Sequence, residues 1–218
     1  MNLIHKAFIY FVVALAIIFG FLTPFDFNNV LGEKSRIIFF HVPVAWISVL
    51  AFFISMIYSV KFIKTRNLYN EIVAFSAAEI GFVFSILATI TGSIFAKFTW
   101  GSFWNWDPRE TSIFILFLIY GAYFSLRISI DSTEKKAMLS SVYLIIAFIT
   151  VPFFIFIMPR IVSSLHPSDT FFSKGTINMS MGMMSVFFLC LFAFTILFFW
   201  ILNLKIRIEK LKSIKNLK

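Results

Sequence analysis

Six long apolar runs leave this chain few folds to choose from. A helix needs about 20 mostly apolar residues to cross the hydrocarbon core of a bilayer. The chain is 60% hydrophobic and 13% charged, about half the charged share of a typical soluble domain. We therefore predict an all-α integral membrane protein with six transmembrane helices and short loops. The apolar runs are Ala7 to Leu22, Ile37 to Val60, Ile72 to Phe98, Thr111 to Leu126, Ala137 to Met158, and Ile177 to Leu204.

These runs use almost the whole chain, so we expect a single membrane domain over residues 1–218. Lys6 precedes the first run, as in a secretory signal, but "GFLTPFDF" offers no small-x-small cleavage site. We expect the first run to be retained as a helix. The single cysteine, Cys190, lies in the sixth run and excludes an intramolecular disulfide.

The distribution of Lys and Arg predicts the orientation in the membrane. Alternate connections carry 13 of these residues on one side and 6 on the other. By the positive-inside rule the richer side is cytoplasmic, so both termini are expected inside. Residues 23–36, 99–110 and 159–176 then form the outer loops. The basic cytoplasmic tail, 205–218, is expected to touch anionic lipid, so the net charge of +9 does not require nucleic acid as a partner.

The middle outer loop contains "WGSFWNWDPRETS", residues 100–112, with three of the five tryptophans in the chain. Tryptophan also gathers at membrane interfaces, and that interpretation stays open. Asp107, Pro108 and Glu110 have the spacing of a helix start: a side-chain cap, proline in the first turn and an acid three residues after the cap. The sequence leaves open whether Asp107 contacts a ligand, a partner or only its own helix.

Two of the three histidines belong to the outer side, which His5 does not. His41 is near the outer start of the second run, and His166 is in the last outer loop. A lone interfacial histidine is more often hydrogen-bonded than bound to metal. Two imidazoles from separate segments, beside a loop of flat rings, instead suit haem, which takes two axial ligands and buries its faces against aromatic rings. Its propionates would be met by outer arginines: Arg36, Arg109 and Arg160.

Other ligands and sites fit less well. A catalytic zinc usually needs three protein ligands, and the outer side has no third His or Cys. Glu79, inside the third run, is a possible intramembrane polar site. Its structural alternative is a protonated side chain hydrogen-bonded near Ser76 or Ser85. "NMSMGMMS", residues 178–185, is read as pliable packing that could line a haem-facing wall.

The tryptophan stretch resembles the W-G-x-x-W-x-W-D-x-R signature of haem-handling proteins of cytochrome c maturation. With "RIIFFHVPVAWIS" before it and "SSLHPSD" after it, nearly the entire chain resembles the CcmC family. "DPRET" is closer to the related CcsA and CcmF proteins, but those have a second histidine pair, and only His5 remains here. The resemblance implies that His41 and His166 ligate haem b transiently and without a covalent bond. The implied platform for haem or partner is Trp100, Gly101, Trp104, Trp106, Asp107 and Arg109.

The resemblance also implies partners and a location. They are a CcmE-like periplasmic haem chaperone, CcmA- and CcmB-like subunits of an ABC transporter, and a small CcmD-like membrane subunit. The expected location is the bacterial inner membrane, with the haem site on the periplasmic side. We expect a protein that binds and delivers haem rather than a turnover enzyme. A compact cytochrome c synthase, a haem transporter across the membrane and a scaffold without ligand remain alternatives.

Overall fold

The computed structural model describes residues 2–24, 32–165 and 180–215, and within them every regular element is a helix. Six helical spans are long and apolar enough to cross a membrane, which confirms the predicted fold class. The fifth span, Thr133–Ile161, is continuous but consists of three elements. The elements are α1 (Leu3–Leu22), the 3-10 helix η1 (Gly32–Ile37), α2 (Ile38–Thr65), α3 (Leu68–Trp100), α4 (Pro108–Ile128), α5 (Thr133–Pro152), the π-helix η2 (Phe153–Ile157), α6 (Met158–Ile161) and α7 (Met181–Lys215).

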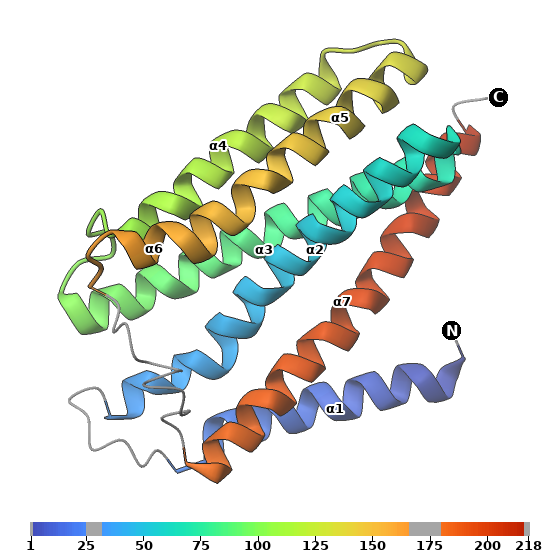
Figure 1. Ribbon diagram of the computed structural model, residues 1–218. Coiled ribbons are helices and arrows are strands. Elements are labelled where there is room, and N and C mark those ends of the chain that lie inside the picture. The colour runs from blue at the N-terminus through green and yellow to red at the C-terminus, as the bar shows by residue number, and fades with distance from the viewer. Residues whose placement is uncertain (1, 25–31, 166–179, 216–218) are drawn as a thin grey trace.

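Helices α2 and α3 form the centre of the bundle. The pair α4 and α5 lies on one side of them, and α1 and α7 lie on the other (Figure 1). Small residues line the contact between α2 and α3, among them Ala51, Ala77 and Gly81. A Cβ atom on Gly81 would lie 2.7 Å from the ring of Phe52, so only glycine permits this approach. Close packing through small residues is the usual way in which membrane helices associate.

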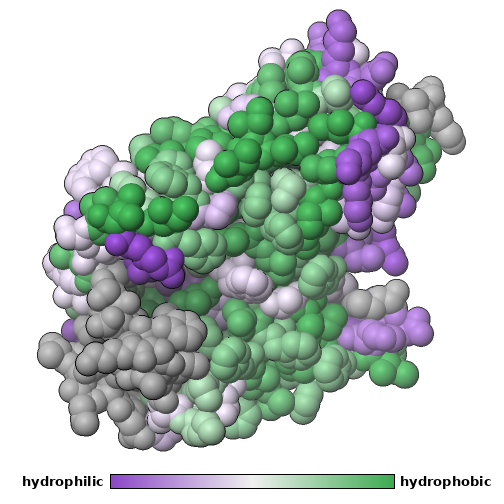
Figure 2. Space-filling view, in the orientation of Figure 1, coloured by the Kyte–Doolittle hydropathy of each residue, from purple (hydrophilic) through white to green (hydrophobic). Residues whose placement is uncertain are grey.

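Both termini lie at one end of the bundle (Figure 1). Helix α4 begins and α6 ends at the opposite end, where α1 also ends and α2 begins. Polar residues gather at the end that carries the termini, and apolar residues cover much of the sides (Figure 2). This arrangement is the one expected if 23–36, 99–110 and 159–176 share a side of the membrane, although the side itself stays a prediction.

The last helix continues well past the predicted boundary at Leu204. Helix α7 runs to Lys215, so most of the basic tail is helical. Glu209 lies 3.3 Å from Lys205 and 2.8 Å from Lys212, at helical spacings of four and three residues. Such pairs support a helix where apolar burial no longer does. The apolar run therefore marked the membrane-spanning part and not the helix end.

Glu79 is paired with a residue that the sequence analysis had placed in the tail. Its Oε2 atom lies 2.8 Å from Nζ of Lys205, rather than at Ser76 or Ser85. The pairing follows from the continuation of α7, which carries Lys205 alongside α3. A second pair, Glu71 and Arg127 at 2.5 Å, joins α3 to α4. The helical spans therefore contain charged residues besides Glu79.

The fifth span changes its hydrogen bonding at Pro152. Proline has no N–H to donate, and a π-helical turn, η2, follows immediately. Helix α6, which contains Pro159, resumes α-helical geometry for one turn. The irregular stretch lies in the part of the span that is farther from the termini, at the end of the bundle where His41 and the tryptophan loop are found.

Candidate functional site

Four segments lie at the end of the bundle opposite the termini. They are the first turn of α2, the last turns of α3, the loop 101–107 and the end of α6 (Figure 1). His41 lies in the first turn of α2. His166, the other candidate ligand, lies outside the described residues. Within the part of the chain that the structure describes, no group of three or more His, Cys, Asp and Glu residues could hold a metal ion.

The ring of His41 is oriented by Thr91 on α3. Nδ1 of His41 lies 2.9 Å from Oγ1 of Thr91. That hydroxyl is also 2.8 Å from the carbonyl oxygen of Leu87 and 3.1 Å from that of Ala88. A hydroxyl has one proton. When that proton goes to the helix carbonyls, Oγ1 of Thr91 accepts a hydrogen bond from Nδ1–H of His41; this is the tautomer that leaves the lone pair on Nε2 and binds a metal through it.

Gly92 makes room for the same ring. A Cβ atom at this position would lie 3.1 Å from Cε1 of His41, closer than an ordinary van der Waals contact. The imidazole thus rests directly against the backbone of α3. The sequence analysis did not identify Thr91 or Gly92. The available signal was "TITGS", a group of small polar residues within an apolar run, which is typical of close helix contacts.

The motif glycine ends α3. Gly101 has a φ of 85° and its N–H donates to the carbonyl oxygen of Lys97 at 3.2 Å, which is the usual left-handed termination of a helix. The chain then turns through 101–107 and starts α4 at Pro108. The helix start predicted from "DPRE" is confirmed in full, with Asp107 as the cap and Glu110 closing the capping box.

The three tryptophans of the motif differ in their surroundings. The ring of Trp100 packs edge-on against Phe95, with 5.7 Å between centroids. Trp104 is half-buried and packs edge-on against Phe114 at 6.3 Å and against Trp106 at 5.8 Å. Trp106 is 72% exposed and has a φ of 56°. A left-handed conformation costs a bulky residue about 1 to 3 kcal/mol.

Asp107 is the most buried polar residue of the loop, with 3% of its surface exposed. Its carboxylate accepts the N–H of Arg109 at 2.9 Å, as a helix cap does. It also accepts a hydrogen bond from Oγ of Ser164 at 2.8 Å and from the N–H of Leu165 at 2.6 Å. Asp107 thus joins the tryptophan loop to the segment after α6, and Leu165 directly precedes His166 in the sequence.

The candidate arginines have different roles in the structure. Arg36 donates to the carbonyl oxygens of Gly20, at 3.1 Å, and Thr23, at 2.8 Å, and pairs with Glu33, so it ties the end of α1 to η1. Arg109 is influenced by two nearby charges, more strongly by the carboxylate of Asp107 and less strongly by the guanidinium of Arg160. Two guanidinium groups together attract a further anion more strongly than one does.

Of the described methionines of "NMSMGMMS", one is buried in the core and another is exposed. Met183 is buried with Val12 and Ala16 of α1, which agrees with the packing interpretation. Met181 is exposed at the start of α7. Met179 lies outside the described residues.

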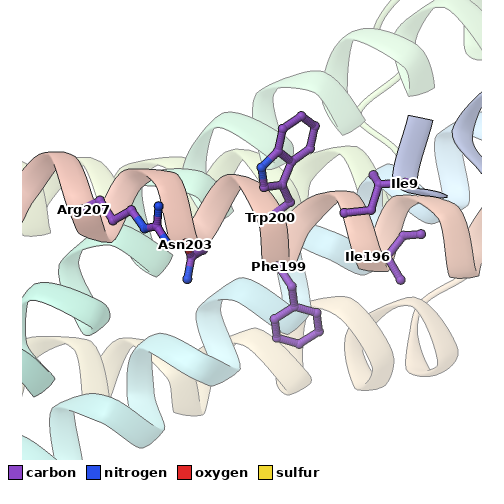
Figure 3. Close-up of a pocket in the computed structure, with 6 residues that line it drawn as sticks. All are labelled: Ile9, Ile196, Phe199, Trp200, Asn203 and Arg207. Atoms are coloured by element: carbon purple, nitrogen blue, oxygen red, sulfur yellow. The ribbon is translucent and has the colours of Figure 1, made fainter. Parts of the chain in front are cut away.

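One surface hollow lies away from these residues. It has a volume of about 440 Å³ and lies between α1 and α7. Figure 3 shows its lining: Ile9 from α1 and, from α7, Ile196, Phe199, Trp200, Asn203 and Arg207. None of the candidate site residues takes part. A smaller apolar cavity of about 210 Å³ lies inward of His41, lined in part by Ala45, Ser48, Ala88 and Ile155.

Known proteins similar to this chain include a putative cytochrome c biosynthesis ccmC-like mitochondrial protein of Marchantia polymorpha. It is 37% identical over 147 residues, which are 66% of this chain and 60% of that protein. Heme exporter protein C of Paracoccus denitrificans (strain Pd 1222) is 36% identical over 126 residues, 58% of this chain and 52% of that protein. A cytochrome c biogenesis protein CcsA of Manihot esculenta is 34% identical over 85 residues, only 36% of this chain and 25% of that protein.

The family comparison covers much more of the chain than any of these pairs. A family model described as heme exporter protein C matches residues 2–217, whereas the likeness to CcsA is confined to about a third of the chain. On this match, the chain belongs to the heme exporter protein C (CcmC) family.

Proposed function

We propose that this protein binds haem b at the end of the bundle that carries His41 and the tryptophan loop, and delivers it to a CcmE-like chaperone for cytochrome c biogenesis. In this proposal, His41 and His166 are the axial ligands of the haem iron. The haem is cargo that is held without a covalent bond and then released. Membership of the heme exporter protein C family supports haem as the ligand.

The observation that carries the proposal is the set of hydrogen bonds made by Asp107. They connect the tryptophan loop with Ser164 and Leu165, the residues that lead directly to His166. His41 is held at the same end of the bundle by Thr91. One proposed ligand thus directly follows a segment that Asp107 anchors to the loop, and the other is held by α3, the helix that leads into the loop.

The surrounding side chains suit a planar, apolar ligand with an anionic edge. Trp100 and Trp104, backed by Phe95 and Phe114, offer ring surfaces that exist before any ligand arrives. Arg109 and Arg160 supply neighbouring positive charges for the propionates. Arg36 is engaged with the end of α1, so its proposed contact with a propionate would be shared with that role.

The proposed mechanism is placement rather than turnover. Two histidine ligands leave no open position on the iron, which suppresses oxygen chemistry while the haem waits. Transfer requires one iron–histidine bond to break, and a histidine of the chaperone can replace it. The proposed setting is the bacterial inner membrane, with the site on the periplasmic side. There the chain would assemble with CcmA- and CcmB-like transporter subunits and a small CcmD-like subunit.

The experiment is a transfer assay with the haem-loaded full chain and a CcmE-like chaperone, followed by absorption spectroscopy. The variants are Asp107→Asn and Ser164→Ala, with Ser163→Ala, an exposed neighbour, as the control. Asparagine caps helices about as well as aspartate, so Asp107→Asn keeps the start of α4 but weakens the bonds to 164–165. We expect less haem bound and transferred by both variants and no change in the control.

Two results would contradict the proposal. One is a wild-type protein that carries haem but transfers none to the chaperone. The other is a covalent thioether product formed on an apocytochrome by this chain and its immediate partner alone, which would indicate the compact cytochrome c synthase instead.

A further inference from the structure

The conformation of Trp106 is unusual for its residue type. At a φ of 56° its backbone is left-handed, a region that glycine and asparagine enter readily and bulky side chains rarely do. Such a conformation persists only where the surrounding structure determines it. The neighbours of Trp106 must therefore supply that constraint.

Glu110 supplies it from the first turn of α4. A single oxygen of its carboxylate, Oε2, accepts the N–H of Asn105 at 2.6 Å and the N–H of Asp107 at 3.3 Å. These are the residues on either side of Trp106, so one side chain holds the backbone on both sides of the strained position. Thr111 adds a weaker contact at 3.4 Å from its hydroxyl to the carbonyl oxygen of Trp106.

The constrained backbone leaves the indole of Trp106 72% exposed, whereas Trp100 and Trp104 are half-buried. An aromatic ring that only anchors a protein at the membrane interface can do so from any ordinary backbone conformation. Interfacial anchoring therefore gives no reason for the left-handed conformation. A ring that must meet a ligand in one orientation does.

We propose that Glu110 is a positioning residue, which holds Trp106 in the left-handed conformation so that the indole is presented to bound haem. The inference rests on the proposed function, because haem is the planar ligand in question. It assigns Glu110 a role beyond capping α4. A purely capping glutamate would stabilise the helix end and leave the retention of haem unchanged.

The test measures the rate of haem loss from the loaded full chain to excess apomyoglobin, together with the unfolding midpoint of the haem-free protein. The variants are Trp106→Gly, Trp106→Phe, Glu110→Ala and the double variant Trp106→Gly/Glu110→Ala. Glu134→Ala is the matched control, because Glu134 is an exposed acid in the first turn of α5. This control shows how far haem loss changes when an acidic residue is removed from a helix start that is not next to the tryptophan loop.

We expect Trp106→Gly to speed haem loss about 3- to 10-fold, the range for one aromatic contact, with an unfolding midpoint no lower than that of the wild type. Glycine accepts the left-handed backbone without strain. Trp106→Phe should retain haem nearly as well as the wild type. Glu110→Ala should speed haem loss to a similar degree although the indole is still present. The double variant should lose haem no faster than Trp106→Gly. Each single change removes the same contact, that of the indole with haem, so the second change has nothing further to remove.

Three results would overturn the inference while the proposed function stands. They are haem retention by Glu110→Ala equal to that of Glu134→Ala, wild-type retention by Trp106→Gly, and losses that multiply in the double variant. The second would make Trp106 an interfacial anchor only. A wild-type protein that takes up no haem overturns the proposed function itself, and this inference with it.

Discussion

Among the single residues, two neighbours that are not themselves candidate ligands determine the position of the His41 ring. Thr91 orients the ring through its hydroxyl oxygen, and Gly92 lets the ring approach the backbone of α3. The tryptophan motif gives no indication of either residue, because both lie before it, within α3. Their role follows from the packing of α2 on α3, which brings residues 50 positions apart in the sequence into contact.

Replacing Thr91 by valine should lower haem affinity about 10-fold or more, the usual effect of removing the hydrogen-bond partner of a metal-binding histidine. Valine keeps the shape of threonine but cannot accept the Nδ1–H bond, so the ring loses its fixed tautomer. A haem titration followed by absorption spectroscopy measures the effect. Thr89→Val is the control, since Thr89 makes the same kind of bond to its own helix at Ser85. Equal affinities for the two variants would contradict this role of Thr91.

The sequence identified the cap at Asp107 but not its second role. The spacing of Asp107, Pro108 and Glu110 is a local signal, and it predicted the start of α4 correctly. The bonds from Asp107 to Ser164 and Leu165 join segments 57 and 58 residues apart. The left-handed backbone of Trp106, held by Glu110, is a conformation that a tryptophan rarely adopts, so the residue type gives no signal of it. Residue patterns could not reveal either feature.

At the scale of the elements, apolar runs locate membrane spans better than they locate helix ends. The sequence predicted all six spans, since each one is a long run of apolar residues. It placed the last helix end at Leu204, but α7 continues to Lys215 through charged residues that pair with one another. The pairing of Glu79 with Lys205 could not be predicted for the same reason.

The two ion pairs of α3 should differ in their contribution to stability. Glu71 and Arg127 are 11% and 17% exposed at their side chains, whereas Glu79 and Lys205 are 33% and 25% exposed. Removal of one partner from a buried pair costs about 3 to 5 kcal/mol, and the cost falls as the remaining charge becomes able to reach water. We therefore expect Glu71→Ala to lower the unfolding midpoint in detergent clearly more than Glu79→Ala. The reverse order would contradict this ranking by burial.

At the scale of the whole molecule, the fold places both termini at one end and the candidate site at the other (Figure 1). The distribution of Lys and Arg predicts that the end with the termini is cytoplasmic. Ser163 and Lys212 are exposed residues that belong to opposite ends. They offer a direct way to determine the orientation.

The chain has a single cysteine, Cys190, which is buried and can be replaced by serine. In that background we expect a cysteine at Ser163 to react with a membrane-impermeant maleimide added outside intact cells. A cysteine at Lys212 should react only after the membrane is opened. Labelling in the opposite pattern would place the tryptophan loop in the cytoplasm and contradict the proposed delivery to a periplasmic chaperone.

In the proposed function, haem is held between His41 and His166 beside the tryptophan loop. The most direct measurement is the absorption spectrum, oxidised and reduced, of the detergent-purified full chain beside His41→Ala and His166→Ala. Two histidine ligands predict a low-spin b-type spectrum in the wild type that weakens in each variant. A wild type that neither carries haem nor takes it up when supplied, or one whose spectrum is unchanged in both variants, would contradict the claim.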